Sequence, residues 1–200
     1  MTITPKTGRK IDGHLENPFD HFIILLCETL NPIARDMNMT PNIITTGSLL
    51  LGLTSVYTVY KRQYYLGAFL YLIAYIMDCW DGNFARAYHM ETVFGDWYDH
   101  ISDMIKWILM TAMIYLRLHK QQRFYFVAFL IPLIILMGTH LGCQEKIYAS
   151  HDPYHNFLSF TKFSCPNPKM IHATKYFGVG TFIIFLCVYL ILLNWLDKTI

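Results

Sequence analysis

Five aspartates lie within a short stretch that separates two strongly apolar runs: Asp78, Asp81, Asp96, Asp99 and Asp103. Ionisable groups close to hydrocarbon are costly unless they have water, a partner or a metal ion. On a helix, Asp78 and Asp81 share one face through their three-residue spacing, and Asp99 and Asp103 share one through their four-residue spacing. Two such helices joined by a short loop would be antiparallel, so the two carboxylate pairs are predicted to converge.

Converging carboxylates repel one another unless they are neutralised. Hard divalent cations take all-oxygen ligands, so Mg²⁺ or Mn²⁺ is the expected counter-charge. Gly82 and Gly95 permit close approach of a backbone or a ligand, and Arg86 offers a planar fork suited to phosphate. These residue types indicate metal-dependent phosphate chemistry. The alternative is a polar contact between helices of a transporter.

Eight positions of this stretch follow the spacing Asp-x2-Asp-Gly-x2-Ala-Arg-x8-Gly-x3-Asp-x3-Asp, namely Asp78, Asp81, Gly82, Ala85, Arg86, Gly95, Asp99 and Asp103. The pattern resembles the signature of the CDP-alcohol phosphotransferases (class I CDP-alcohol phosphatidyltransferases), most closely over residues 41–103. The resemblance implies an integral membrane enzyme of phospholipid biosynthesis. Such an enzyme moves a phosphate-bearing group from CDP-diacylglycerol or a CDP-aminoalcohol to an alcohol and releases CMP.

The same resemblance implies a role for each site residue. Two ions of Mg²⁺ or Mn²⁺ are expected on Asp78, Asp81, Asp99 and Asp103, and Asp103 is also the expected catalytic base for the acceptor hydroxyl. The substrate-binding residues expected by resemblance are Gly82, Ala85, Arg86, Asn42, Thr45 and Gly95, of which Asn42 and Thr45 belong to a Thr-Pro-Asn-x-x-Thr opening that many members carry on their first span.

The acceptor is left open between a small polar alcohol and diacylglycerol. Met104 stands where synthases that use inositol or glycerol phosphate commonly have a basic residue, whereas Asp99-His100 resembles the Asp-His pair of choline and ethanolamine phosphotransferases. Two further groups lie near the acidic face. Asp96 fits a supporting or interface role, and Lys106 fits either a counter-charge deep in the span or a structural ion pair.

Composition sets the class of protein. The chain has 200 residues, of which 54% are hydrophobic and 15% charged, so it is too apolar for an ordinary soluble domain. A net charge of +2 gives no basic field for nucleic acid. The five scattered cysteines form no Cys-x-x-Cys pair, so neither a disulfide framework nor a zinc site is expected. They are interpreted as buried small apolar residues.

The predicted fold is an all-α polytopic membrane helix bundle with about five to six transmembrane helices. Residues 1–16 are expected to be a flexible tail and residues 17–200 the enzyme domain. Residues 17–37 have the pattern of an amphipathic helix lying in the membrane interface, which Pro32 should kink or break. The expected spans are 40–60, 65–87, 93–118, 124–143 and 171–193, with a polar loop over 144–169. This count is one fewer than the six spans usual in the family.

Charge favours a cytosolic active site, because the expected motif side has the larger number of basic residues. That side has Lys6, Arg9, Lys10, Arg35, Arg86, Lys146, Lys162 and Lys169, and the other has Lys61, Arg62, Arg117, Lys120, Arg123 and Lys198. The expected partners are the CDP-linked donor, the alcohol acceptor and membrane lipids, and a homodimer is one expected assembly. The alternative function is a non-catalytic transporter or scaffold that retains the motif.

Overall fold

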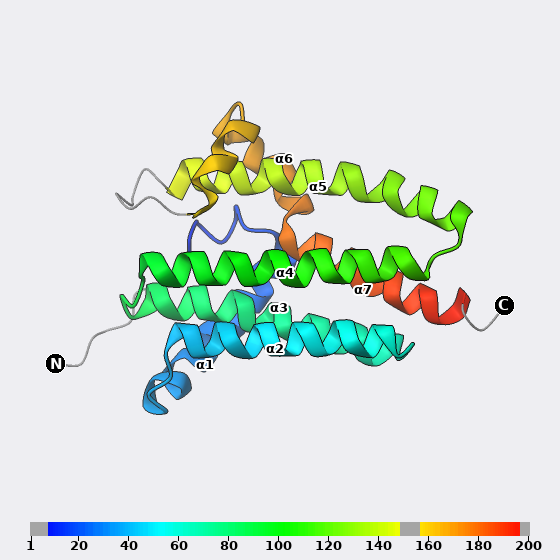
Figure 1. Cartoon of the computed structure of the whole chain (residues 1–200). Coiled ribbons are helices and arrows are strands. Elements are labelled where there is room, and N and C mark those ends of the chain that lie inside the picture. Colours follow the sequence, from blue (N-terminus) through cyan, green and yellow to red (C-terminus); the bar gives the residue numbers. More distant parts are fainter. Residues whose placement is uncertain (1–7, 149–156, 197–200) are drawn as a thin grey trace.

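A computed structural model describes residues 8–148 and 157–196 of the chain. Within these residues every regular element is a helix, and the long helices run side by side along one common direction (Figure 1). The elements in chain order are α1 (Pro18–Asp36), α2 (Pro41–Tyr60), α3 (Tyr64–Ala87), α4 (Val93–Arg117), α5 (Lys120–Tyr148), η1 (Phe157–Ser164), η2 (Pro168–Met170), α6 (Ile171–Thr174), η3 (Lys175–Phe177) and α7 (Val179–Leu196). The predicted all-α helix bundle is confirmed.

Three of the long helices begin at a residue whose side chain caps them. The Asn17 amide oxygen accepts from the Phe19 N–H at the start of α1. Thr40 caps α2, and the Thr92 hydroxyl oxygen accepts from the Gly95 N–H at the start of α4. A side-chain acceptor at this position satisfies an N–H that has no partner inside the helix. α2 and α4 start at the same end of the bundle, because short turns join the antiparallel helices α2, α3 and α4.

The core forms around α2 and α3, which pack along their full lengths. α2 also packs against α4, while α7 and α1 cover other faces of α3. The largest buried cluster joins Tyr64 and Tyr71 of α3 to Met110 of α4, Phe126 of α5 and Leu186 of α7. α3 and α4 approach each other less closely than either approaches α2. The acidic side chains of the motif lie between α3 and α4.

Within the described residues, three helical stretches are long and apolar enough to cross a membrane: Pro41–Tyr60, Lys120–Tyr148 and Pro168–Trp195. These helices support an integral membrane protein, as predicted. α3 and α4 have 24 and 25 residues. At ~1.5 Å per residue they exceed the ~30 Å of a bilayer core, but the charged motif residues lower their hydropathy. That α3 and α4 also span stays a prediction.

α1 agrees with the helix expected over 17–37 to within one residue at each end, and it continues through Pro32 to Asp36. Two other expected boundaries were wrong. α5 extends to Tyr148 and contains Pro132, so the expected polar loop loses its first residues to a helix. The last long helix begins at Val179, because the ten residues from Pro168 to Phe177 form a series of short helical turns. Polar residues thus extend α5 beyond its apolar run, whereas short helical turns replace the expected start of the last span.

Residues 8–16 lie against the bundle instead of extending away from it. The Arg9 guanidinium pairs with Glu16 and Glu28, and the Lys10 ammonium pairs with the buried carboxylate of Glu145 on α5. Ile11 is buried in the same region. The described half of the expected tail is therefore held by ion pairs. Residues 1–7 lie outside the described residues.

Asp20 joins three helices. The Tyr75 hydroxyl on α3 donates to its Oδ1 atom at 2.6 Å, and the Gly180 N–H at the start of α7 donates to Oδ2 at 3.4 Å. A Cβ atom on Gly180 would lie 2.0 Å from Asp20 Oδ1, so glycine is needed for this approach. Burial raises the pKa of Asp20 to about 6.

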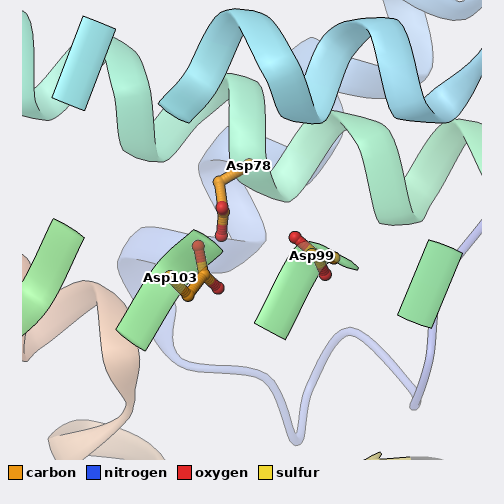
Figure 2. A group of neighbouring side chains, drawn as sticks. All are labelled: Asp78, Asp99 and Asp103. Carbon is orange, nitrogen blue, oxygen red and sulfur yellow. The ribbon is translucent and has the colours of Figure 1, made fainter. Parts of the chain in front are cut away.

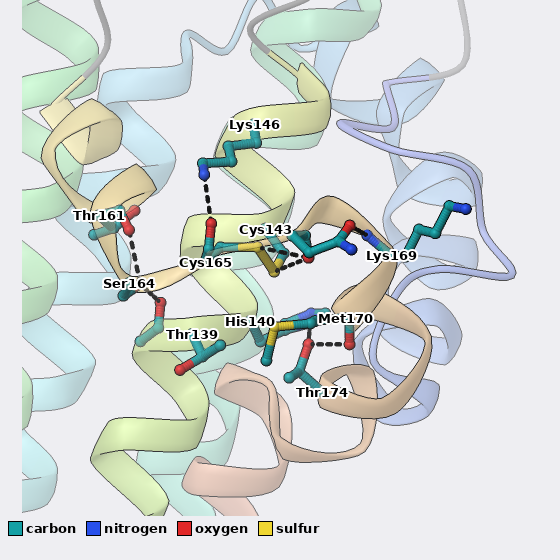
Figure 3. The surroundings of a disulfide bond; sticks show 12 residues. Thr139, His140, Cys143, Lys146, Thr161, Ser164, Cys165, Lys169, Met170 and Thr174 are labelled. Carbon is teal, nitrogen blue, oxygen red and sulfur yellow. Dashed lines mark hydrogen bonds between the residues drawn. A yellow bond between two sulfur atoms is a disulfide. The ribbon is translucent and has the colours of Figure 1, made fainter.

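The expectation that the cysteines form no disulfide was wrong. Cys143 on α5 and Cys165 after η1 are bonded, with their Cα atoms 5.1 Å apart (Figure 3). The Ser164 hydroxyl donates to the Gly138 carbonyl at 2.7 Å, and the Lys146 ammonium donates to the Cys165 carbonyl. These contacts hold η1 against α5. The other three cysteines are free, and Cys27 is buried as expected.

Candidate active site

Three of the four expected metal ligands converge between α3 and α4. One carboxylate oxygen from each of Asp78, Asp99 and Asp103 lies within 4.8 Å of the other two. Figure 2 shows Asp78 directed from α3 toward the two aspartates of α4. The turn between the helices is five residues long, so the two helices are antiparallel as expected. The helical spacing within the motif and the short turn together create the cluster.

Asp81 is the fourth expected ligand, and it lies outside that group of three. Its carboxylate is buried, and its Oδ2 atom accepts from the Thr45 hydroxyl of α2 at 2.6 Å. The same Thr45 hydroxyl lies 3.1 Å from the Pro41 carbonyl, to which it is the alternative donor. Thr45 was expected to contact the donor. In this structure it orients Asp81, which connects α2 to the acidic motif.

Arg86 is fixed by two glycines. Its Nε atom donates to the Gly8 carbonyl at 2.8 Å, and its guanidinium folds back over Gly82, one turn earlier on α3. A Cβ atom on Gly82 would lie 3.1 Å from Arg86 Nη1. One on Gly8 would lie 2.1 Å from the Asn83 carbonyl oxygen. The N-terminal segment therefore reaches the motif helix through a backbone contact that only glycine permits.

The remaining expected substrate residues lie at the same end of the bundle. Asn42 on α2 approaches Gly95 on α4, where an added Cβ atom would be 3.2 Å from the Asn42 amide oxygen. Ala85 is half-buried on α3. Next to the contact between Asn42 and Gly95, the hydroxyls of Thr46 and Tyr98 are 2.9 Å apart and connect α2 to α4. The expected substrate residues thus gather where α2, α3 and α4 meet.

Asp96 and His100 face the η1 segment. The Phe157 N–H donates to Asp96 Oδ2 at 2.5 Å, and the Phe157 ring stacks on the His100 ring with centroids 5.4 Å apart. His100 Nδ1 lies 2.7 Å from the Asp96 carbonyl oxygen. Trp97 meets the same phenyl ring edge-on. Asp96 therefore anchors η1 beside the cluster, which matches the supporting role expected for it.

The residues present fit a divalent metal ion. All three converging ligands are oxygen atoms, the donor type that Mg²⁺ and Mn²⁺ prefer. The Oδ1 atom of Asp99 is buried and has no hydrogen-bond partner among the described residues. A buried carboxylate oxygen without a donor is costly, and a bound cation would remove that cost.

Comparison with known families agrees with this geometry. A family model described as CDP-alcohol phosphatidyltransferase matches residues 38–200, which is most of the chain. The chain belongs to the CDP-alcohol phosphatidyltransferase family. It is therefore a membrane transferase of substituted phosphate groups, which acts in phospholipid synthesis on a CDP-alcohol donor and an alcohol acceptor. Divalent metal ions are general in this family. Comparisons with curated proteins and with solved structures found no match.

Sequence reasoning missed several contacts that shape the site. Gly8 gave no signal, because its partner Arg86 is 78 residues away. Phe157 lay in a stretch interpreted as loop, and it contacts the acidic helix only through the folded chain. Ser48 and Gly52 lie inside the first expected span, and no motif distinguishes them there, although Ser48 bonds to Lys106 and Gly52 packs against its side chain.

Proposed function

We propose that this transferase cleaves the diphosphate of a CDP-linked donor, either CDP-diacylglycerol or a CDP-aminoalcohol, with Asp78, Asp81, Asp99 and Asp103 as its metal ligands. The observations that support the proposal most directly are the convergence of Asp78, Asp99 and Asp103 and the unpartnered Oδ1 atom of Asp99. We propose Mg²⁺ or Mn²⁺, and two ions in the complex with the donor. When bound, such ions neutralise the diphosphate and stabilise charge on departing CMP.

The chain's own residues supply donor binding and orientation. Arg86, held by the Gly8 carbonyl, presents the rest of its guanidinium fork to donor phosphate. Asn42 and Gly95 bring α2 and α4 together at the site's edge, and Gly82 and Ala85 keep side-chain bulk low on α3 for the cytidine. Thr45 contributes by holding Asp81 rather than by meeting the donor.

Asp103 is the proposed base for the acceptor hydroxyl. Its side chain is 38% exposed, against 13% for Asp78 and 23% for Asp99. A base must reach the proton that it removes, so the most accessible carboxylate of the cluster suits this role. The acceptor itself, a small polar alcohol or diacylglycerol, is to be identified by assay with several alcohols.

The proposed roles separate in a series of Asp→Asn variants, which keep size and remove charge. Replacement of Asp78, Asp81 or Asp99 should weaken donor binding and turnover together. Asp103→Asn should retain donor binding while turnover falls by roughly 10²–10⁴-fold. Asp96→Asn is the matched control, because Asp96 supports η1. Its effect on donor binding and turnover should be much milder. The measurements are donor affinity by calorimetry and CMP release. An Asp96 variant as inactive as the Asp78 variant would show that the ligands are wrongly chosen.

For orientation we propose that the motif end faces the cytosol, where the larger number of basic residues places it. The Cys143–Cys165 disulfide at the same end is the contrary indication, because disulfides are rare in the cytosol. Labelling of a cysteine introduced at the exposed His89 distinguishes the two orientations of the motif end. Access from the cytosolic side is expected. Access from the other side, or a glycan on Asn38 of the Asn-x-Thr sequon at this end, would reverse the orientation.

A further inference from the structure

An ammonium group lies inside the acidic cluster. Lys106 of α4 is only 5% exposed, and its Nζ atom lies 2.7 Å from Asp78 Oδ1 and 2.8 Å from Asp103 Oδ1. A third oxygen, the Ser48 hydroxyl of α2, lies 2.6 Å from the same atom. Three oxygens therefore surround Nζ, which matches the three donors of an ammonium group.

The chain makes room for this lysine. A Cβ atom on Gly52 of α2 would lie 2.6 Å from Lys106 Cδ and 2.7 Å from its Cγ, so any larger residue would displace the side chain. Ser48 is oriented as well, because its hydroxyl donates to the Ala74 carbonyl of α3 at 2.8 Å and leaves its lone pairs for Lys106. Two residues of α2, one turn apart, thus fix where the ammonium lies.

The ammonium and the expected metal ions compete for the same ligands. Asp78 and Asp103 both belong to the group of three that converges for a cation, and both bind Nζ. An oxygen lone pair that holds an ammonium proton is not available to a metal ion, and two cations in contact repel. Asp99, with its unpartnered Oδ1, has no bond to Lys106 among the described contacts.

The formal charges of the cluster also limit how many divalent ions it can hold without substrate. Asp78, Asp81, Asp99 and Asp103 carry four negative formal charges, of which Lys106 offsets one and a single divalent ion offsets two. With that one ion the cluster stays negative. A second divalent ion would make it positive, which is favourable only once a diphosphate brings its own negative charge.

We propose that Lys106 occupies the position of the second cation in the free enzyme. The free enzyme then holds one divalent ion, and the second binds with the donor diphosphate when Lys106 releases Asp78 and Asp103. Lys106 is in this sense a positioning residue that sets metal stoichiometry. The inference rests on the proposed function, because it presupposes that these aspartates bind metal.

The test counts Mn²⁺ ions bound to the purified chain without donor, by electron paramagnetic resonance and equilibrium dialysis. Wild type should bind one ion per chain. Lys106→Met, which keeps an unbranched side chain only one atom shorter and removes its charge, should bind two, or bind the second at least tenfold more tightly. Its melting temperature should fall in EDTA, because the aspartates lose their counter-charge, and recover with Mn²⁺. Lys61→Met, at an exposed lysine at the end of α2, should change none of these values.

Two results would overturn the inference. One is a wild-type chain that binds two Mn²⁺ ions equally well without donor. The other is a Lys106→Met variant with unchanged stoichiometry and a melting temperature that falls equally with and without Mn²⁺, which is the behaviour of a structural ion pair. If Lys106→Met does not fold, Ser48→Ala keeps the lysine, removes one of its three acceptors, and should tighten the second ion a few-fold. An unchanged second affinity in Ser48→Ala would then contradict the inference. Failure of the proposed function looks different, because then no variant and no wild-type chain binds Mn²⁺.

Discussion

The contact between Gly8 and the motif helix gives a prediction for Gly8→Ala. The added Cβ atom would lie 2.1 Å from the Asn83 carbonyl oxygen, whereas ordinary contacts begin near 3.4 Å, so the N-terminal segment must withdraw by about 1 Å. That movement lengthens the 2.8 Å bond from Arg86 Nε beyond hydrogen-bonding distance. A hydrogen bond to a charged group contributes about 1.5–3 kcal/mol. If about half of this energy serves to orient Arg86, donor affinity should fall by roughly 4–10-fold.

The assay is donor affinity by calorimetry beside the KM for donor in CMP release. Asp12→Ala is the control, since Asp12 is exposed on the same segment and should leave donor affinity unchanged. A double-mutant cycle with Arg86→Gln isolates the contact, because Gly8→Ala should have little further effect once Arg86 is lost. Wild-type donor affinity in Gly8→Ala, or an effect that adds fully to that of Arg86→Gln, would refute the role given to this segment.

Three further predictions concern residues around the site. Thr45→Val removes the hydroxyl that donates to Asp81 and should lower kcat/KM in the CMP-release assay roughly 10–100-fold; an unchanged value would mean that Asp81 needs no such support. Cys165→Ser opens a disulfide that spans 22 residues and should cost roughly 3 kcal/mol of stability, measured as a lower melting temperature. A reducing agent should lower the melting temperature of the wild type by the same amount and leave that of the variant unchanged. Burial raises the pKa of Asp20 to about 6, so wild-type stability should fall by roughly 1–3 kcal/mol as pH rises from about 4 to above 6. Asp20→Asn should flatten this pH profile of the melting temperature, and a variant with the same slope would exclude Asp20 as the cause.

The acidic cluster was predictable because its geometry is local. Helical spacing places Asp78 and Asp81 on one face and Asp99 and Asp103 on another, and a turn too short to allow anything but an antiparallel return brings them together. Burial of Asp81 against Thr45 instead of within the group of three depends on how α2 packs, and no spacing along the chain encodes it.

The contacts made by distant segments could not be predicted in the same way. Cys143 and Cys165 are separated by 22 residues without a metal-like or paired motif, and scattered cysteines of this kind are interpreted as buried thiols. The segment after Gly8 has no apolar run, so it looked like a tail. It is held instead by long-range ion pairs such as Lys10 with Glu145, 135 residues apart.

Pro32 and Lys106 show how context overrides a local rule. A proline inside a helix normally kinks or breaks it, because proline lacks the backbone N–H donor and crowds the preceding turn. α1 nevertheless continues through Pro32, with Asn31 and Ala34 buried on either side. The spacing of Lys106 alone allowed two interpretations, a counter-charge deep in the span or a structural ion pair. Only the positions of Ser48 and Gly52 on the neighbouring helix reveal that a site was built for its ammonium.

The most direct test of the central claim is metal-dependent CMP release by the purified protein. We expect release from CDP-diacylglycerol or from a CDP-aminoalcohol with a suitable alcohol, its loss after EDTA, its return with Mg²⁺ or Mn²⁺, and its absence in the Asp99→Asn variant. Full release after exhaustive chelation would contradict the metal-dependent mechanism. No release from either donor with any alcohol would support the alternative of a non-catalytic membrane protein that retains the motif.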